Sequence, residues 1–154
     1  MTYRDLDLRL IEALREDGRA SIRSLAERLS VSPSTAGKRL DSLIARGVIT
    51  GFGPLLDYQK LGFGLVAITK IKARGDALPT IVDALSRDRH LTHVYEITGD
   101  FDVLVIGRFR NEGEMNREIK RLLGLPGIEG TNTSVVLSAA KEAGPIDLAP
   151  SEEE

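Results

Sequence analysis

Residues 21–52 constrain the fold of this chain more than any other stretch of it. Two runs with apolar residues at helical spacing are separated by Ser30-Val31-Ser32-Pro33. Ser32 can cap the second run through its hydroxyl, and Pro33 can occupy the first helical position, where its missing N–H costs nothing. Gly47 ends this run. We therefore expect two short helices joined by a tight turn.

A further helix is expected before this pair, over residues 5–16. Apolar residues recur there at positions that share one face of a helix. Ser21 is a suitable cap for the helix that follows. The N-terminal part is therefore predicted to be a three-helix unit, with residues 48–52 as a short strand behind it.

The two faces of the third helix differ in chemistry. The inward face is expected to carry Ala36, Leu40, Leu43 and Ile44. The outward face is expected to carry Ser34, Thr35, Lys38 and Ser42, with Arg39 on the flank. A face of hydroxyls and one cation is small enough for a helix to enter a DNA major groove, which is about 12 Å wide. Hydroxyls and N–H groups at a helix N-terminus suit phosphates and base edges.

The charge of the chain is unevenly distributed. The net charge of −2 is unusual for a protein that binds nucleic acid. Between Arg19 and Arg46, however, six basic residues stand against two acidic ones, while acidic residues gather toward the C-terminus. This pattern indicates a basic module attached to an acidic one.

The composition excludes several classes of protein. The absence of cysteine excludes disulfides, thiol catalysis and cysteine-ligated metals. No apolar run approaches the roughly 20 residues of a membrane span, and the N-terminus shows no signal peptide. A cytoplasmic location is expected, with no membrane partner.

Ordered pieces between Leu6 and Ile49 match the pattern of one known family. The pieces are Leu6-Asp7-Leu8-Arg9-Leu10-Ile11, Asp17-Gly18-Arg19, Leu25-Ala26, Ser32-Pro33-Ser34-Thr35, Arg39-Leu40, Leu43 and Gly47-Val48-Ile49. This set resembles the Lrp/AsnC (feast/famine) family of bacterial and archaeal transcriptional regulators, which carry a winged helix-turn-helix. The resemblance implies that the third helix recognises double-stranded DNA. The candidate DNA-binding residues are Ser21, Ser32, Ser34, Thr35, Lys38, Arg39 and Ser42.

The second half of the chain follows a different pattern. Strands are expected over residues 65–72, 91–98, 102–109 and 128–138, with helices over 76–87 and after Asn111. The order βαββαβ predicts a ferredoxin-like antiparallel sheet with both helices on one face, and hence an α+β fold. Valine, isoleucine and leucine on the helix-free face need cover, so we expect a homodimer through this module.

Four segments follow from these assignments. They are a helix-turn-helix domain over 1–52, a linker over 53–63, a βαββαβ effector-binding and dimerisation domain over 64–140, and a disordered acidic tail over 141–154. Apolar residues such as Leu55 and Tyr58 indicate that the linker is ordered.

Gly99-Asp100-Phe101-Asp102 looks like the Gly-Asp-aromatic-Asp turn of the same family. The resemblance implies an adjacent pocket for a small effector, usually an amino acid, and the assembly of dimers into an octamer. Asp100 or Asp102 could bind an ammonium group. The candidate effector-binding residues are Thr98, Gly99, Asp100, Asp102, Thr131, Thr133 and Ser134. The alternative is structural: Gly99-Asp100 is a good hairpin turn, Asp102 is a local cap, and threonine is common in strands.

Enzyme function is not expected, and neither is a cofactor, a catalytic residue or a metal. His90 and His93 are the only histidines, and a surface or loop-edge role is favoured because a metal would need ligands from elsewhere. Three alternatives stay open. They are a helical unit that only dimerises, an enzyme that resembles sirohaem decarboxylases on the same scaffold, and an effector-sensing oligomer without DNA binding.

Overall fold

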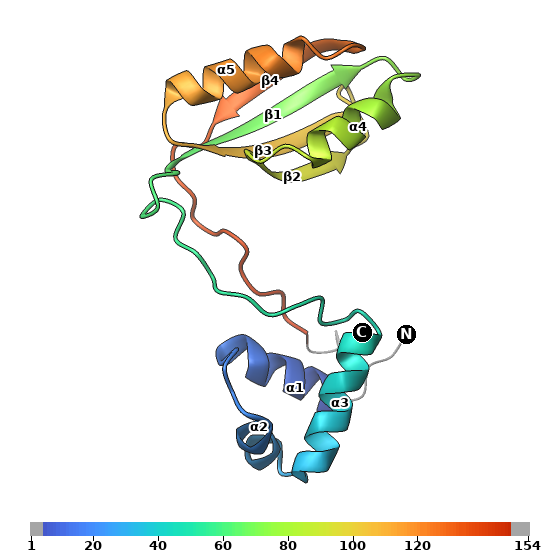
Figure 1. Ribbon diagram of the computed structural model, residues 1–154, viewed down its shortest axis with the longest axis vertical. Coiled ribbons are helices and arrows are strands. Elements are labelled where there is room, and N and C mark those ends of the chain that lie inside the picture. Colours follow the sequence, from blue (N-terminus) through green and yellow to red (C-terminus); the bar gives the residue numbers. More distant parts are fainter. Residues whose placement is uncertain (1–4, 149–154) are drawn as a thin grey trace, which may run out of the picture. The chain divides into compact units, whose positions relative to one another are not determined.

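The computed structural model describes residues 5–148 and divides the chain into two compact units (Figure 1). Unit 1 contains the described residues up to Leu55 and those from Ala143 onward. Unit 2 contains Leu56–Glu142.

Unit 1 is built on three helices: α1 (Asp5–Glu16), α2 (Ile22–Leu29) and α3 (Pro33–Ala45). Both predicted caps are confirmed. The Ser21 hydroxyl accepts a hydrogen bond from the Ser24 amide at 3.1 Å, and the Ser32 hydroxyl accepts one from the Thr35 amide at 3.1 Å. Gly47 follows α3 with φ +69°, a left-handed conformation that costs glycine little. The helix boundaries therefore follow from local chemistry.

The core of unit 1 lies between the three helices. Its buried members are Leu10, Ala13, Leu25, Leu29 and Leu43. The prediction that Ile44 packs inward is wrong, because 45% of its surface is exposed. Successive residues of a helix are rotated by about 100° around its axis. Ile44 therefore points away from the side of α3 on which Leu43 packs against α1 and α2.

The strand predicted over residues 48–52 is not formed. Instead, the amides of Val48 and Ile49 both donate to the Leu43 carbonyl, at 2.9 and 3.2 Å, and close the end of α3. A strand exists only with a neighbouring strand to pair with, and unit 1 offers none among its described residues.

The segment that opens unit 2 contains a turn at residues 58–62 and otherwise no regular element. The Phe63 amide donates to the Tyr58 carbonyl at 2.8 Å. The guanidinium of Arg108 lies 4.9 Å from the centre of the Tyr58 ring, and that of Arg110 lies 4.4 Å from the Phe63 ring. These cation–π contacts hold the segment against the end of a strand.

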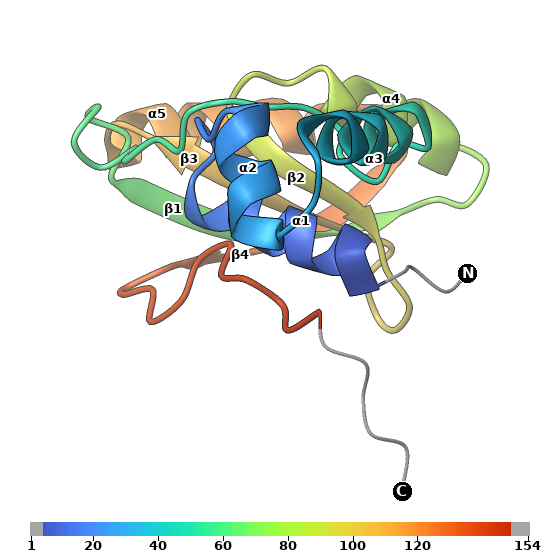
Figure 2. The ribbon, with the colours of Figure 1, turned by 90° about the horizontal axis from the view of Figure 1, so that it is seen from below.

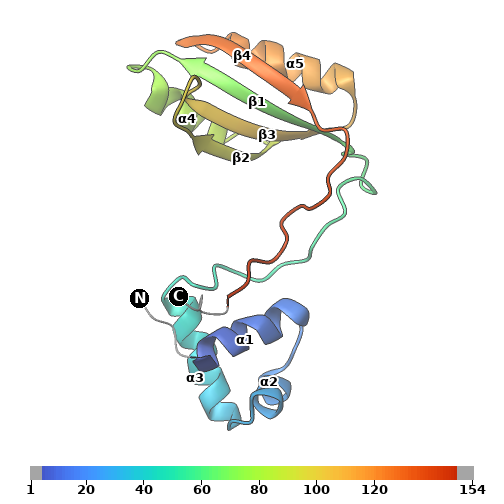
Figure 3. The same cartoon turned by 180° about the vertical axis from the view of Figure 1, so that it is seen from behind.

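Unit 2 has the predicted ferredoxin-like topology. Its elements are β1 (Leu65–Ala73), α4 (Leu78–Ser86), β2 (Leu91–Glu96), β3 (Val103–Phe109), α5 (Glu112–Leu123) and β4 (Ile128–Val135). The strands lie in the order β2-β3-β1-β4, and every neighbouring pair is antiparallel. Figures 2 and 3 show α4 and α5 on the same face of this sheet.

The core of unit 2 lies between the sheet and its two helices. Its largest buried side chains are Ile71, Ile81, Leu85, Val103, Val105 and Leu122. On α5, Leu123 is 49% exposed, whereas Glu118 is only 7% exposed. The buried stripe of α5 thus includes a carboxylate, for which the apolar pattern gave no reason.

Of the predicted tail, residues 141–148 form no helix or strand, and 149–154 lie outside the described residues. The Arg15 guanidinium donates to the Ile146 carbonyl at 3.0 Å within unit 1. In the part of the chain that the structure describes, no helix is both long and apolar enough to span a bilayer.

Candidate nucleic-acid interface and regulatory turn

The N-terminus of α3 presents several of the predicted contact residues. Ser32 and Thr35 share a hydrogen bond between their hydroxyls at 2.8 Å, in addition to the capping bond. Ser21 is likewise occupied as the cap of α2. These three hydroxyls therefore stabilise the helices, while Ser34 stays exposed on the outer face.

Lys38 is the exposed cation at the centre of this outer face. No carboxylate in the described residues forms an ion pair with it, whereas nearby Arg23 lies 3.2 Å from Glu27 and Arg28 contacts Glu16. An unpaired ammonium is free to approach a phosphate without breaking a contact within the protein. Ser42 lies one turn further along the helix and is half-buried.

Arg39 is placed differently from Lys38. Its Nη1 atom lies 3.6 Å from Asp7 Oδ1, and Arg46 Nη1 lies 3.7 Å from Asp7 Oδ2. Asp7 is only 3% exposed, and an unpaired charge is costly to bury. The pairing therefore links α1 to α3 and fixes Arg39 at the flank.

Asp7 was not singled out from the sequence as a functional or structural residue. A signal was available, because Asp7 lies three positions before Leu10 on the apolar face of α1. A carboxylate on a buried face needs a cationic partner from another element.

The turn between β2 and β3 contains the predicted regulatory residues. Gly99 has φ +112°, and Asp100 is exposed at the tip. The Asp102 carboxylate accepts a hydrogen bond from the Ala73 amide at 2.8 Å and lies 3.4 Å from Lys72 Nζ. The Ala73 N–H in particular holds the pKa of Asp102 below its usual value. Asp102 thus braces the turn against β1 and is not the local cap of the structural alternative, because its partners come from a distant strand.

The candidate hydroxyl residues do not share one face of the sheet. Thr133 pairs opposite Thr69, and their hydroxyls lie 2.9 Å apart on the side of the helices. Thr131 pairs opposite the core residue Ile71 and lies on that same side. Ser134 pairs opposite Ile68 and lies on the helix-free side. Thr98, Gly99 and Asp100 are exposed in the turn itself.

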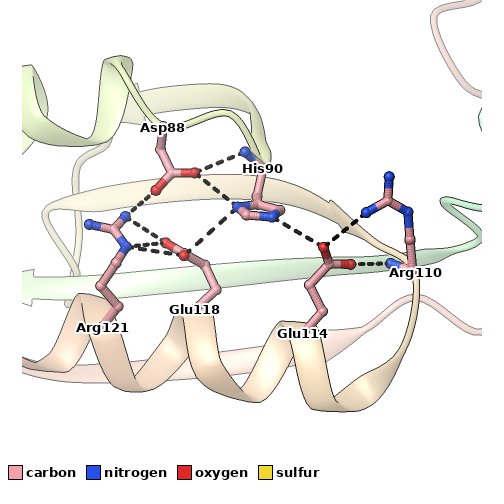
Figure 4. Close-up of polar contacts among 6 residues, drawn as sticks. All are labelled: Asp88, His90, Arg110, Glu114, Glu118 and Arg121. Carbon is pink, nitrogen blue, oxygen red and sulfur yellow. Dashed lines mark hydrogen bonds and ion pairs between the residues drawn. The ribbon is translucent and has the colours of Figure 1, made fainter.

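The two histidines have different surroundings. His93 is exposed on β2, where its Nδ1 lies 3.0 Å from the Thr92 hydroxyl. His90 lies among carboxylates that the fold brings from distant positions, including Glu114 and Glu118 of α5 (Figure 4). This group was not predicted, because the spacing of its members along the chain carries no motif.

Two family models match the chain, one for each unit. Residues 3–50 match the winged helix-turn-helix DNA-binding model, and residues 66–146 match the Lrp/AsnC ligand binding domain.

Similar proteins are found along nearly the whole length. An uncharacterized HTH-type transcriptional regulator of Pyrococcus furiosus is 43% identical, over 92% of this chain and 96% of its own. The proline dehydrogenase transcriptional activator of Rhizobium radiobacter is 33% identical, over 90% of this chain and 91% of its own. A solved complex of a transcriptional regulator from Neisseria meningitidis with L-Met has a TM-score of 0.89 at 24% identity, covering 96% of this chain and 98% of that one.

Proposed function

The chain belongs to the Lrp/AsnC family of transcriptional regulators, and on this premise we propose how it binds DNA, assembles and senses its effector. It is a DNA-binding regulator with a ligand-binding domain. The observation that carries the proposal is the exposed face of α3, where Ser34 and the unpaired Lys38 follow a capped helix N-terminus. We assign residues 1–52 to DNA binding, 53–63 to the linker, 64–140 to effector binding and dimerisation, and 141–154 to a tail.

On this assignment α3 lies in the major groove. Ser34, Lys38 and Ser42 face the DNA, and the N-terminus of the helix favours an approaching phosphate. Ser21, Ser32 and Thr35 act mainly by holding the helix ends in place, since their hydroxyls are already bonded. Arg39 reaches the DNA from the flank while its guanidinium neutralises Asp7.

Replacing Lys38 with alanine is expected to weaken binding to every DNA sequence alike, because an ammonium that contacts a phosphate carries no base preference. The slope of log K against log salt should become shallower by about 0.9, the value for one phosphate contact. Fluorescence anisotropy over a salt series measures both quantities. Lys120→Ala, the same substitution on an exposed position of α5, is the matched control. An unchanged affinity and slope in Lys38→Ala would exclude a phosphate contact at this position.

Assembly is proposed to use the helix-free face of the sheet. Ile68 and Ile106 pair across β1 and β3, and Val66 and Leu104 lie on the same side. A second copy of the chain can cover this apolar area, and two-fold pairing of the helical units doubles the number of DNA contacts. Further assembly of dimers, up to an octamer, is proposed from the resemblance to the family.

The effector is proposed to be an amino acid bound near the turn over residues 98–102. The L-Met complex of the Neisseria regulator supports this class of ligand. Asp100 is the carboxylate of the turn that is not used in bracing it, and so is suited to an ammonium group. Thr98 and Gly99 adjoin it. Thr131, Thr133 and Ser134 are two strands away, so we assign them a secondary part.

Assembly and effector binding can be tested together. Sedimentation velocity at micromolar concentration is expected to give a dimer or a larger assembly without any ligand. A thermal-shift screen with the common amino acids is expected to raise the melting temperature for at least one of them, since a ligand that binds only the folded state stabilises it. A monomer would overturn the role of the sheet face, and a screen without any shift would overturn the choice of ligand class.

The chain is further proposed to act in the cytoplasm and not as an enzyme. The names of its relatives support regulation over catalysis. Visible absorption by the purified protein, or binding of a haem precursor, would favour the decarboxylase alternative instead.

A further inference from the structure

Six titratable side chains of unit 2 form one network (Figure 4). Asp88 and His90 come from the segment between α4 and β2, Arg110 from the end of β3, and Glu114, Glu118 and Arg121 from α5. None of them takes part in the proposed DNA or effector contacts. The network therefore needs a separate explanation.

Each of two buried carboxylates in this network is divided between two partners. Arg121 Nη2 contacts Asp88 Oδ2 and lies 2.6 Å from Glu118 Oε1. The other oxygens face His90, whose Nδ1 lies 3.5 Å from Asp88 Oδ1 and 3.9 Å from Glu118 Oε2. Glu118 Oε2 also accepts a hydrogen bond from Arg121 Nε at 3.0 Å. Both carboxylate side chains are 8% exposed. One ligand atom from each of these three residues lies within 4.8 Å of the other two.

The far side of the imidazole is held by a third carboxylate. His90 Nε2 lies 3.3 Å from Glu114 Oε1, and the other oxygen of Glu114 accepts the Arg110 amide at 2.6 Å. A neutral imidazole that donates Nε2–H to Glu114 presents a lone pair at Nδ1. Three acceptor atoms then face one another: His90 Nδ1, Asp88 Oδ1 and Glu118 Oε2.

The charges of the network leave room for a cation. It contains three carboxylates and two guanidinium groups, so with a neutral imidazole its net charge is −1, and a bound divalent ion would change this to +1. A cation placed between His90 Nδ1, Asp88 Oδ1 and Glu118 Oε2 would contact all three acceptors.

We propose that Asp88, His90 and Glu118 bind a divalent transition-metal ion of the zinc type, with Glu114 orienting the imidazole. One imidazole nitrogen with two carboxylate oxygens suits Zn²⁺ better than Mg²⁺. Bonds of about 2.0–2.1 Å in a tetrahedral site place neighbouring ligand atoms about 3.4 Å apart. The Nδ1-to-oxygen distances of 3.5 and 3.9 Å are close to this spacing.

The surrounding structure is already arranged for such a site. The His90 ring stacks on Phe109 with 5.7 Å between centroids, and the His90 amide donates to Asp88 Oδ1 at 2.8 Å. Arg121 contacts the outer oxygens of both carboxylates and can remain as their support, while its Nε also donates to Glu118 Oε2 at 3.0 Å, so a bound ion would share that oxygen with Arg121. In zinc sites a carboxylate commonly accepts the other N–H of a ligating histidine, and here Glu114 occupies that position. Bound metal would clamp the segment before β2 to α5.

The test is a titration of chelator-treated full-length protein with ZnCl₂, followed by calorimetry and by the melting temperature of unit 2. Wild type is expected to bind one Zn²⁺ per chain and to melt at a higher temperature with it, whereas MgCl₂ should have no such effect. His90→Gln should abolish this binding. His93→Gln removes the other, exposed histidine and should bind like wild type.

A substitution of Glu114 tests whether this residue orients the His90 imidazole without binding the metal itself. Glu114→Gln keeps a carbonyl acceptor but loses the charge, and its Zn²⁺ affinity should fall by about 10–100-fold without a change in stoichiometry. Each variant must match the circular dichroism of wild type, so that a loss of binding is not a loss of fold. Zn²⁺ binding that survives in His90→Gln, or no binding in wild type, overturns the proposal. A melting temperature that depends on pH but not on Zn²⁺ also overturns it, since a proton on Nδ1 then fills the gap.

Discussion

Leu43→Ala is expected to lower the free energy of unfolding of unit 1 by about 2–5 kcal/mol, the range for truncating a fully buried leucine. Leu43 has 0% exposed surface and packs with Leu10, Leu25 and Leu29 where the three helices meet. A domain of about fifty residues has a total stability of only roughly 3–8 kcal/mol. The variant should therefore populate an unfolded helical unit and lose DNA affinity, while unit 2 stays folded. Amide hydrogen exchange in α1–α3 measures this change separately from unit 2.

Ile44→Ala is the matched control for Leu43→Ala. The two residues are adjacent, but Ile44 is 45% exposed, so its truncation should cost less than about 1 kcal/mol. Equal protection loss in the two variants would contradict the observed orientation of α3 and would restore the inward face expected from the sequence.

Gly127→Ala is expected to destabilise unit 2 by about 2–5 kcal/mol through two separate effects. Gly127 has φ +90°, and a left-handed conformation costs an L-residue about 1–2 kcal/mol. A Cβ atom at this position would also lie 2.2 Å from the Ala77 Cβ, at the start of α4, and overpacking of this kind costs about 1–3 kcal/mol. Urea denaturation of the full-length protein, followed through unit 2, measures the sum.

Gly62→Ala separates these two contributions. Gly62 has φ +87°, and no atom lies within 4 Å of where its Cβ would be, so only the backbone strain applies. The difference in unfolding free energy between the two variants estimates the cost of the clash between residue 127, just before β4, and Ala77 at the start of α4. Similar losses of stability in both variants would mean that α4 moves aside at little cost.

Local chemistry made much of the fold predictable. Ser21 and Ser32 cap helices through their own hydroxyls, and Pro33 and Gly47 begin and end α3, so these boundaries depend on residues a few positions apart. The order βαββαβ with short connections likewise allows few sheet topologies. Both predictions were confirmed because short-range hydrogen bonding and chain connectivity decide them.

The errors arose where a distant partner decides the outcome. The strand expected over residues 48–52 lacks a neighbouring strand within the described chain, so its amides close α3 instead. Thr133 and Ser134 were grouped as hydroxyl donors, yet adjacent strand residues point to opposite faces, and the pairing register with β1 separates them. For Asp102, predicted as an effector ligand, the partner that the sequence did not reveal is the Ala73 amide of β1.

The sequence by itself determined the helices, the four strands of unit 2, their order and the chemistry of the α3 face, because caps, periodicity and connectivity act over short distances. Only the tertiary structure decided which charges are buried and what they meet. Asp7 on α1 pairs with Arg39 on α3, and Glu118 on α5 lies near His90, which comes just before β2. A buried charge is tolerated only where the fold supplies its partner, and that partner lies far away in the sequence.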